Sequence, residues 1–152
     1  MNKIITLAIA LLFCHSLSAQ DSHQAVQDAF MDALRANDAA ALGALYAPDA
    51  VSFDLAAQRL DGPAAIANAW GGFFSQSRVL EADLINPHVE IHGDTGVAWG
   101  EFAMRFEPIE GGEAMDMKGR YSDVTRNIDG RWLYVMDHVS VPAPGEEEHA
   151  TE

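Results

Sequence analysis

The spacing of apolar residues changes once along the chain, near Arg78, from a period of about 3.6 residues to a period of two. Before that point the sequence predicts three helices, with a short strand between the second and the third. After it, the alternation of apolar and polar residues predicts long strands joined by hairpins. This order of elements indicates an α+β domain in which the helices cover one face of a curved antiparallel sheet.

The first predicted helix is capped at Asp21 or Ser22 and ends at Asn37-Asp38. Asp38 caps a second, short helix, which Pro48-Asp49 ends, and Asp61-Gly62-Pro63 starts the third. The side chains expected to point inward from the three helices are Val26, Phe30, Ala33 and Leu34; Leu42, Leu45 and Tyr46; and Ile66, Trp70, Phe73 and Phe74. The short strand between them contains Val51, Phe53 and Leu55.

The predicted strands cover Leu80 to His92, Val97 to Phe106, Met115 to Asn127 and a last run that ends at Val141. Turns are expected at Asp94-Thr95, Gly111-Gly112 and Asp129-Gly130. The Asp-Gly pair is well suited to a two-residue type I′ turn, since both residues tolerate a positive φ angle. Ile128 should therefore lie opposite Arg131.

Counting back from that turn pairs Asp123 with Met136 and Tyr121 with His138. Asp137 then lies on the other face, where a cross-strand ion pair with Arg120 is expected. The face with Asp123 also receives residues from the two preceding strands. Its members are Val89, Ile91, Ala98, Gly100, Phe102, Met104, Phe106, Tyr121, Asp123, Thr125, Trp132, Tyr134, Met136, His138 and Ser140. Aromatic groups with a few polar ones are typical of a ligand pocket.

Composition and charge indicate a single exported domain and disfavour some classes of binding partner. The chain has 152 residues, of which 49% are apolar, enough for one domain with a core. Lys3, an apolar run and Ser16 to Ala19 predict a secretion signal at 1–19, a single domain at 20–142 and an acidic disordered tail at 143–152. We therefore expect an exported protein, periplasmic or extracellular. Without the signal the chain has 8 basic and 23 acidic residues, a net charge of −15, which disfavours nucleic acid and anionic membranes as partners.

Neither a cofactor nor a metal is predicted. Cys14, in the signal, is the only cysteine, so the mature domain has no disulfide or thiolate ligand. His88, Glu90 and His92 alternate along one strand, but its outer members are about 13 Å apart, since each residue rises about 3.3 Å. The same count places this row on the face away from the pocket.

Three segments carry a family resemblance: LYAPDAVSFD, DGPAAIANAW and the ending DGRWLYVMDHVSVP. In order and spacing they resemble the NTF2-like superfamily, in its SnoaL-like and ketosteroid isomerase-like branch, which includes DUF4440-type domains. The resemblance covers Gln24 to Pro142. It implies a cone whose helices close over a bent sheet, with a pocket inside, and it implies a homodimer.

Ketosteroid isomerase uses an aspartate base together with a tyrosine and a protonated aspartic acid that bind the oxyanion. By similarity, the base corresponds to Asp54 and the protonated acid to Asp123. The tyrosine corresponds to Phe30, which has no proton to donate, so half of that oxyanion site is missing. His138 is a possible replacement donor. The related epoxide hydrolases need an Asp-Arg-Asp set, and Tyr121 occupies the place of the arginine, which disfavours epoxide hydrolysis.

Each candidate also has a structural interpretation. Asp54 can be a solvated turn residue, and Asp123 can be hydrogen-bonded to Tyr121, Tyr134 or His138. His138 can be a histidine held by Asp123 or Ser140.

Two functions remain open. The first is binding of a small hydrophobic molecule, lined by Phe30, Trp70, Phe74, Phe102, Tyr121, Tyr134 and Met136. The second is cofactor-free proton transfer of isomerase, dehydratase or cyclase type, in which Asp54 is the base and Asp123 or His138 is the donor.

Overall fold

The computed structural model describes residues 22–56 and 58–142, and the predicted secretion signal and acidic tail lie outside these residues. The described part confirms the α+β layout, with three helices and one six-stranded sheet. In order, the elements are α1 (His23–Ala36), α2 (Ala39–Gly43), β1 (Tyr46–Phe53), β2 (Arg59–Asp61), α3 (Gly62–Phe74), β3 (Ser77–His92), β4 (Thr95–Pro108), β5 (Met115–Ile128) and β6 (Arg131–Ser140).

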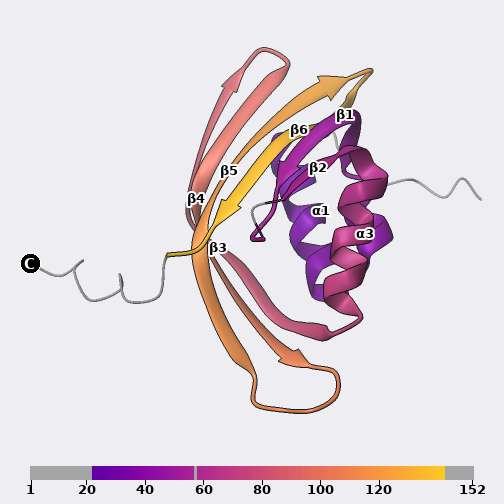
Figure 1. Ribbon diagram of the computed structural model, residues 1–152. Helices are drawn as coiled ribbons and strands as arrows, with labels where there is room; N and C mark the ends of the chain where they lie inside the picture. The colour runs from indigo at the N-terminus through magenta and orange to yellow at the C-terminus, as the bar shows by residue number, and fades with distance from the viewer. Residues whose placement is uncertain (1–21, 57, 143–152) are drawn as a thin grey trace, which may run out of the picture.

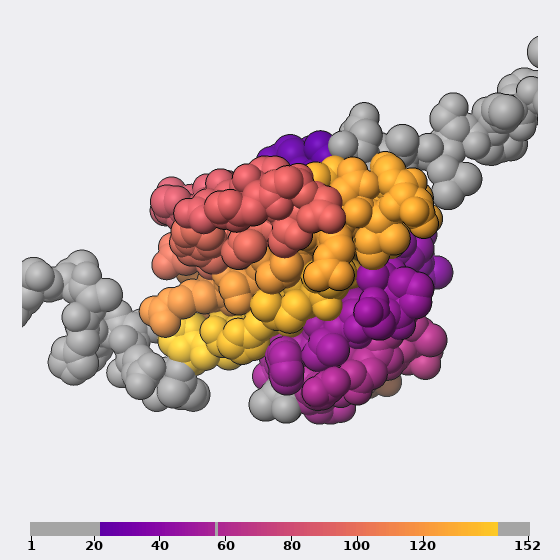
Figure 2. All heavy atoms as spheres, turned by 90° about the horizontal axis from the view of Figure 1, so that it is seen from above, coloured from indigo at the N-terminus to yellow at the C-terminus, as the bar shows by residue number. Residues whose placement is uncertain are grey.

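The sheet has the strand order β2-β1-β6-β5-β4-β3, and all neighbours are antiparallel except β1 and β6. It curves strongly around α1 and α3, which lie on its concave side (Figure 1). Seen from above, the surfaces of β3–β4, β5, β6 and β1 follow one another across the molecule in that order (Figure 2). None of the described helices is both long and apolar enough to cross a bilayer.

The caps predicted at Ser22 and Asp38 and the end of α1 are confirmed, but α2 ends at Gly43, before the predicted break at Pro48-Asp49. Ser22 Oγ accepts a hydrogen bond from the N–H of Ala25 at 3.1 Å, and Asp38 Oδ1 accepts one from the N–H of Ala41 at 2.9 Å. Asn37 ends α1 in the left-handed conformation, with a φ of 55°. Asp61 precedes α3 as predicted, but its carboxylate binds Arg59 at 2.8 Å and caps no backbone N–H.

Two clusters of buried residues hold the helices on the sheet. One joins α1 and α3 to β1 and β6 through Val26, Ile66 and Tyr134, and the other joins α1 to β3 and β4 through Leu34, Val79 and Met104. α2 packs closely on α3 at Gly43, where an added Cβ would lie 2.8 Å from both Ala67 Cβ and the carbonyl oxygen of Pro63. This contact therefore depends on the absence of a side chain.

The β5–β6 turn is the predicted one. Asp129 and Gly130 have φ angles of 52° and 83°, and Ile128 lies opposite Arg131. The other two turns differ: β3 turns into β4 at Gly93-Asp94, and the β4–β5 connection is longer than two residues. Both errors shift the register by two positions, which preserves the faces. Phe102 thus stays on the face of Asp123, which lies opposite Ala98.

A β-bulge in β6 overturns part of the predicted register. Thr125 lies opposite Tyr134 but Val124 lies opposite Met136, so Val135 is an extra, unpaired residue. Because a slip of one residue exchanges the two faces, the residues beyond the bulge turn over. Asp123 lies opposite Asp137, and Met136 is on the convex face.

The pairings predicted beyond the bulge are therefore wrong. Met136 is not opposite Asp123, and Tyr121 lies opposite Val139 rather than His138. The expected ion pair between Arg120 and Asp137 does not form, because Arg120 lies opposite Ser140.

The first strand also begins earlier than the sequence pattern predicts. β1 starts at Tyr46, before Pro48, and runs parallel to β6. Ser52 in β1 lies beside Asp137 in β6. The three-residue β2, which was not predicted, pairs with the end of β1 and leads directly into α3.

Candidate functional site

A cavity of about 320 Å³ is lined by residues of the concave face of the sheet and of helices α1 and α3. Its lining residues include the three predicted catalytic candidates and five of the seven predicted ligand-binding residues. These eight are Asp54, Asp123 and His138, and Phe30, Trp70, Phe102, Tyr121 and Tyr134. Sites that bind small molecules are usually apolar clefts of this kind with a few polar groups.

Two predicted lining residues lie elsewhere. The bulge in β6 turns Met136 to the other face of the sheet. Phe74 packs behind Trp70, with its ring stacked at a centroid distance of 5.6 Å, and Phe73 lines the cavity in its place. Helical periodicity cannot separate two adjacent residues that both face the core.

Aromatic rings form one end of the cavity. Phe30 on α1 meets Trp70 on α3 and Tyr134 on β6 edge to face, at centroid distances of 6.1 and 5.7 Å. Trp70 also packs edge to face on Phe73. These contacts fix the walls against which an apolar molecule would pack.

Two carboxyl groups lie together in the polar part of the cavity. Asp123 on β5 and Asp137 on β6 are direct cross-strand neighbours, which places their Cβ atoms about 5 Å apart. Gln27 on α1 donates to Asp123 Oδ2 at 3.3 Å, and Tyr46 Oη donates to Asp137 Oδ2 at 2.6 Å. The Oδ1 atom of each carboxyl group is buried without a hydrogen-bond partner.

Burial makes both carboxyl groups weaker acids. It raises the pKa of Asp123 to about 7, with the charge of Asp137 adding to the effect and the Gln27 hydrogen bond opposing it. Burial also raises the pKa of Asp137, opposed by hydrogen bonding from Ser52 and Tyr46. Tyr46 keeps its proton as a donor, because burial raises the pKa of its hydroxyl further. Near neutral pH Asp123 is therefore protonated in a large fraction of the molecules.

Asp54 lies just after β1 and closes its own turn. Its Oδ1 accepts hydrogen bonds from the N–H groups of Ala56 at 3.0 Å and Gln58 at 2.8 Å. The residue is half-buried and lines the cavity. The structure thus supports the turn interpretation and also brings Asp54 to the same cavity as Asp123.

His138 borders the cavity, but the bulge in β6 turns its exposed side chain to the face of Met136 rather than the face of Asp123, where it was predicted. It lies opposite Ser122, and its ring packs edge to face on Phe53 with a centroid distance of 6.3 Å. His138 therefore lies beside the carboxyl pair rather than within it.

Sequence reasoning missed two residues of the polar part. The sequence did not place Asp137 in the cavity, because the pattern of apolar and polar residues in β6 fits either assignment of its residues to the two faces of the sheet. Gln27 did give a signal: it precedes Met31 and Leu34 at helical spacing, so a polar residue occupies a row that is otherwise apolar.

A second buried polar contact lies at the start of α1. His23 Nδ1 and Thr125 Oγ1 are 2.7 Å apart, and burial lowers the pKa of the histidine. Gly96 on β4 leaves room for this contact, since a Cβ there would lie 2.8 Å from His23 Nδ1. The pair fastens the helix to the strand that carries Asp123.

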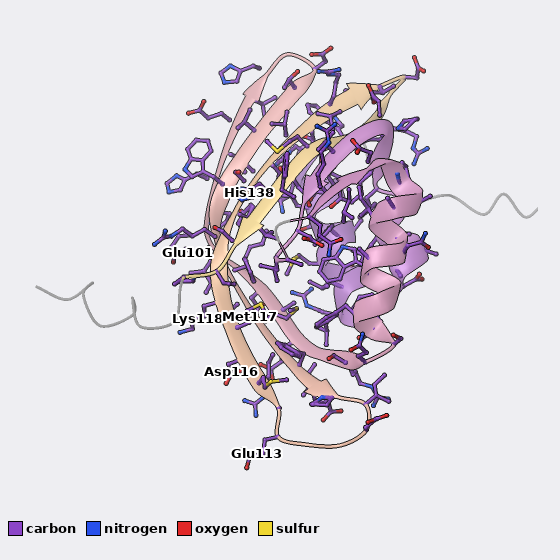
Figure 3. All side chains as sticks on the ribbon, in the orientation of Figure 1. Glu101, Glu113, Asp116, Met117, Lys118 and His138 are labelled. Carbon is purple, nitrogen blue, oxygen red and sulfur yellow. The ribbon has the colours of Figure 1, made fainter. Side chains whose placement is uncertain are left out.

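The convex face carries charged residues, and Glu101 and Lys118 project there away from the helices (Figure 3). His88 stacks on Trp99 at a centroid distance of 5.6 Å, and His92 lies 3.1 Å from Glu90. Within residues 22–56 and 58–142, no group of three His, Cys, Asp or Glu side chains is arranged to hold a metal ion.

Solved structures of several bacterial proteins share this fold. An NTF2-like superfamily protein from Salmonella enterica has a TM-score of 0.68 and 19% identity, over 83% of this chain and 92% of that one. An NTF2-like protein from Cytophaga hutchinsonii has a TM-score of 0.65 and 17% identity, over 77% and 93%. A proposed dehydratase of the NTF2-like family from Streptomyces avermitilis has a TM-score of 0.65 and 16% identity, over 77% and 91%.

No protein with a curated description matches the sequence. At the identities above, the solved structures show the fold alone, which is that of the NTF2-like superfamily. The family profile of the SnoaL-like domain matches residues 24–144, which span both sides of the cavity. On this match the chain belongs to the SnoaL-like domain family of the NTF2-like superfamily.

Proposed function

We propose that this domain is exported and binds a small, largely apolar molecule in its cavity. The observation that carries the proposal is the lining: aromatic and aliphatic side chains from α1, α3 and the sheet surround about 320 Å³, and the polar groups are few. Burial of apolar ligand surface against such walls supplies most of the binding free energy. The exported location rests on the sequence of residues 1–19.

A cavity-filling substitution tests the proposal. Ala69 on α3 lines the cavity, whereas Ala64 on the same helix is exposed and does not. The neutral naphthalene dye prodan should bind the wild type with a blue-shifted emission. Ala69→Phe should weaken its binding about tenfold or more, since the added ring occupies ligand space.

Ala64→Phe is the matched control and should bind the dye as the wild type does. Equal affinity for all three proteins would contradict the cavity as the binding site. Native mass spectrometry of the purified chain from Gln20 to Glu152 should in addition show a bound apolar passenger, whose mass identifies the compound to test next.

Proton-transfer catalysis is the second candidate, and the carboxyl pair favours it. Asp123, which is protonated in a large fraction of the molecules near neutral pH, offers a donor beside the carboxyl group of Asp137. In this function Asp54 removes a proton from the carbon next to a carbonyl, and Asp123, rather than the turned-over His138, donates to the oxygen. The proposed dehydratase among the similar structures is consistent with such chemistry, although the likeness itself extends only to the fold.

Deuterium exchange at the α-carbon of an apolar ketone such as tetralone, followed by NMR in heavy water, tests this candidate. Asp54→Asn should slow the exchange by about a hundredfold or more, because a general base is lost. Its ketone affinity should stay within about twofold, since the same oxygen still accepts the hydrogen bonds that close the turn. A parallel loss of affinity and exchange would argue against Asp54 as the base.

A further inference from the structure

The polar part of the cavity contains acidic groups, and among the described residues the only basic side chain beside them is His138, at the edge of the cavity. Among the described residues, no lysine or arginine lines the cavity. Lys118, for example, projects from the convex face, away from the helices (Figure 3). Asp123 is only 5% exposed, so its carboxyl group is removed from water without a counter-charge. The buried carboxyl groups therefore lack a counter-charge from the protein, and a cationic ligand can supply it.

Three buried oxygen atoms of this part have no hydrogen-bond partner. They are Asp123 Oδ1, Asp137 Oδ1 and Tyr121 Oη. Their residues are neighbours, since Asp123 and Asp137 are paired across the strands and Tyr121 is two positions before Asp123 on the same face. All three residues line the cavity. Buried polar atoms normally have partners, and unpaired ones inside a ligand cavity indicate where ligand donors bind.

We propose that the molecule held in this cavity is an apolar primary amine, whose ammonium group binds between Asp123 and Asp137 and against Tyr121 Oη. This inference rests on the proposed binding function and specifies its ligand class. A primary ammonium group has three N–H donors, which match the three unpartnered oxygens. The hydrocarbon part of the amine then packs against Phe30, Trp70 and Phe73.

The charge supports a cationic ligand. An ammonium group next to the pair favours the ionised form of both carboxyl groups, so that both Oδ1 atoms can accept its hydrogen bonds. Hydrogen bonds between ionised partners are about twice as strong as neutral ones, and more so in an apolar cavity. An alcohol or a ketone satisfies fewer of the three oxygens and leaves the charge uncompensated, and a carboxylate ligand is repelled.

Matched amines and alcohols test the proposal at neutral pH. Naphthylethylamine is compared with naphthylethanol, and phenylbutylamine with phenylbutanol, by titration calorimetry on the wild-type protein. Each amine should bind about tenfold or more tightly than its alcohol. If the alcohols bind as well as the amines, the amine assignment is overturned and the apolar binding function stands. If no member of either pair binds, both proposals fail.

Substitutions then locate the ammonium site. Asp123→Asn and Asp137→Asn should each reduce amine affinity about tenfold or more and leave alcohol affinity within about threefold. Tyr121→Phe, which removes one oxygen and keeps the ring, should reduce amine affinity about threefold. Asp129→Asn makes the same charge change in the same hairpin, outside the cavity lining, and preserves a good turn sequence. It should bind both ligands as the wild type does.

The variants also have a result that would overturn the proposal. If Asp123→Asn and Asp137→Asn retain the amine affinity of Asp129→Asn, the ammonium group is not bound by this pair. Tyr121→Phe provides an independent readout, because the substitution leaves both carboxyl groups in place.

Discussion

At the scale of single residues, Asp123 has the most unusual environment. Its carboxyl group is buried between α1 and the sheet, accepts one hydrogen bond from Gln27 and faces the carboxyl group of Asp137. Each of these neighbours is uncharged or negatively charged, and the Gln27 hydrogen bond offsets only part of the cost of ionising the buried group. The folded state therefore favours the protonated form.

This preference predicts how stability depends on pH. The pKa of Asp123 rises from 3.8 to about 7 on folding. The stabilisation that protonated Asp123 contributes to the free energy of unfolding is therefore fully present below pH 3.8 and is lost as the pH rises to about 7. Asp123→Asn removes that loss. Its free energy of unfolding, relative to the wild type, should increase between these two pH values by on the order of 4 kcal/mol. Urea denaturation across this pH range measures the difference.

Asp129→Asn provides the baseline for that experiment, because Asp129 lies in an exposed turn. The raised pKa would be contradicted if the free energy of unfolding of Asp123→Asn, minus that of the wild type, stays constant or falls as the pH rises. Taking differences also cancels the opposite contribution of His23, whose lowered pKa favours folding at higher pH.

At the scale of elements, the bulge in β6 decides which residues line the cavity. The type I′ turn sets the register correctly from Ile128 to Thr125, and the extra residue Val135 then changes it. Everything from Met136 to Ser140 is turned over by this one residue. The pairing of β1 with β6 agrees with these reversed faces, since Val51 lies beside Met136 and Ser52 beside Asp137.

Engineered disulfides test this register. Val124→Cys combined with Met136→Cys places two cysteines directly opposite each other and should form a disulfide on air oxidation. Asp123→Cys combined with Met136→Cys places them on opposite faces and should not. The chain from Gln20 onward has no other cysteine, so a thiol assay reports the new pair alone. If the Asp123→Cys and Met136→Cys pair formed the disulfide and the Val124→Cys and Met136→Cys pair did not, the register without a bulge would be the correct one.

At the scale of the whole molecule, the convex face of the sheet carries an apolar row across four strands. Val97, Val124, Met136 and Val51 are successive cross-strand neighbours, and the nearby Trp99 is 40% exposed. Solvent-facing sheets with such rows often pack on a partner. We propose that two copies of the chain associate through this face.

Val124→Lys should convert that homodimer to a monomer in sedimentation velocity at micromolar concentration, because it buries a charge in the apolar row. Ile109→Lys is the matched control: it makes the same change at an exposed loop residue and should remain dimeric. Since residues 20–152 carry a net charge of −15, added salt should favour the dimer. A monomeric wild type at all salt concentrations would contradict the proposal.

The sequence predicts the fold better than it predicts the site. Helix caps such as Ser22 and Asp38 and the Asp129-Gly130 turn are local signals, and the structure follows them. The two misplaced turns shifted the register by an even number, so Asp123, Phe102 and Tyr121 still share one face. The bulge at Val135 has no local signal, because it depends on how β6 packs between β1 and β5. Asp137 was therefore assigned to the wrong face.

The unpaired Val135 also affects how relatives of this protein are compared. A relative that lacks this residue differs from β6 by a single deletion, and an alignment can place that gap elsewhere in the strand. Its pocket would then present the side chains equivalent to Met136 and His138 where this chain presents Asp137. Transfer of site residues by alignment column alone would misassign the acidic pair, and the spacing between the Asp-Gly turn and the aspartate is the quantity to check first.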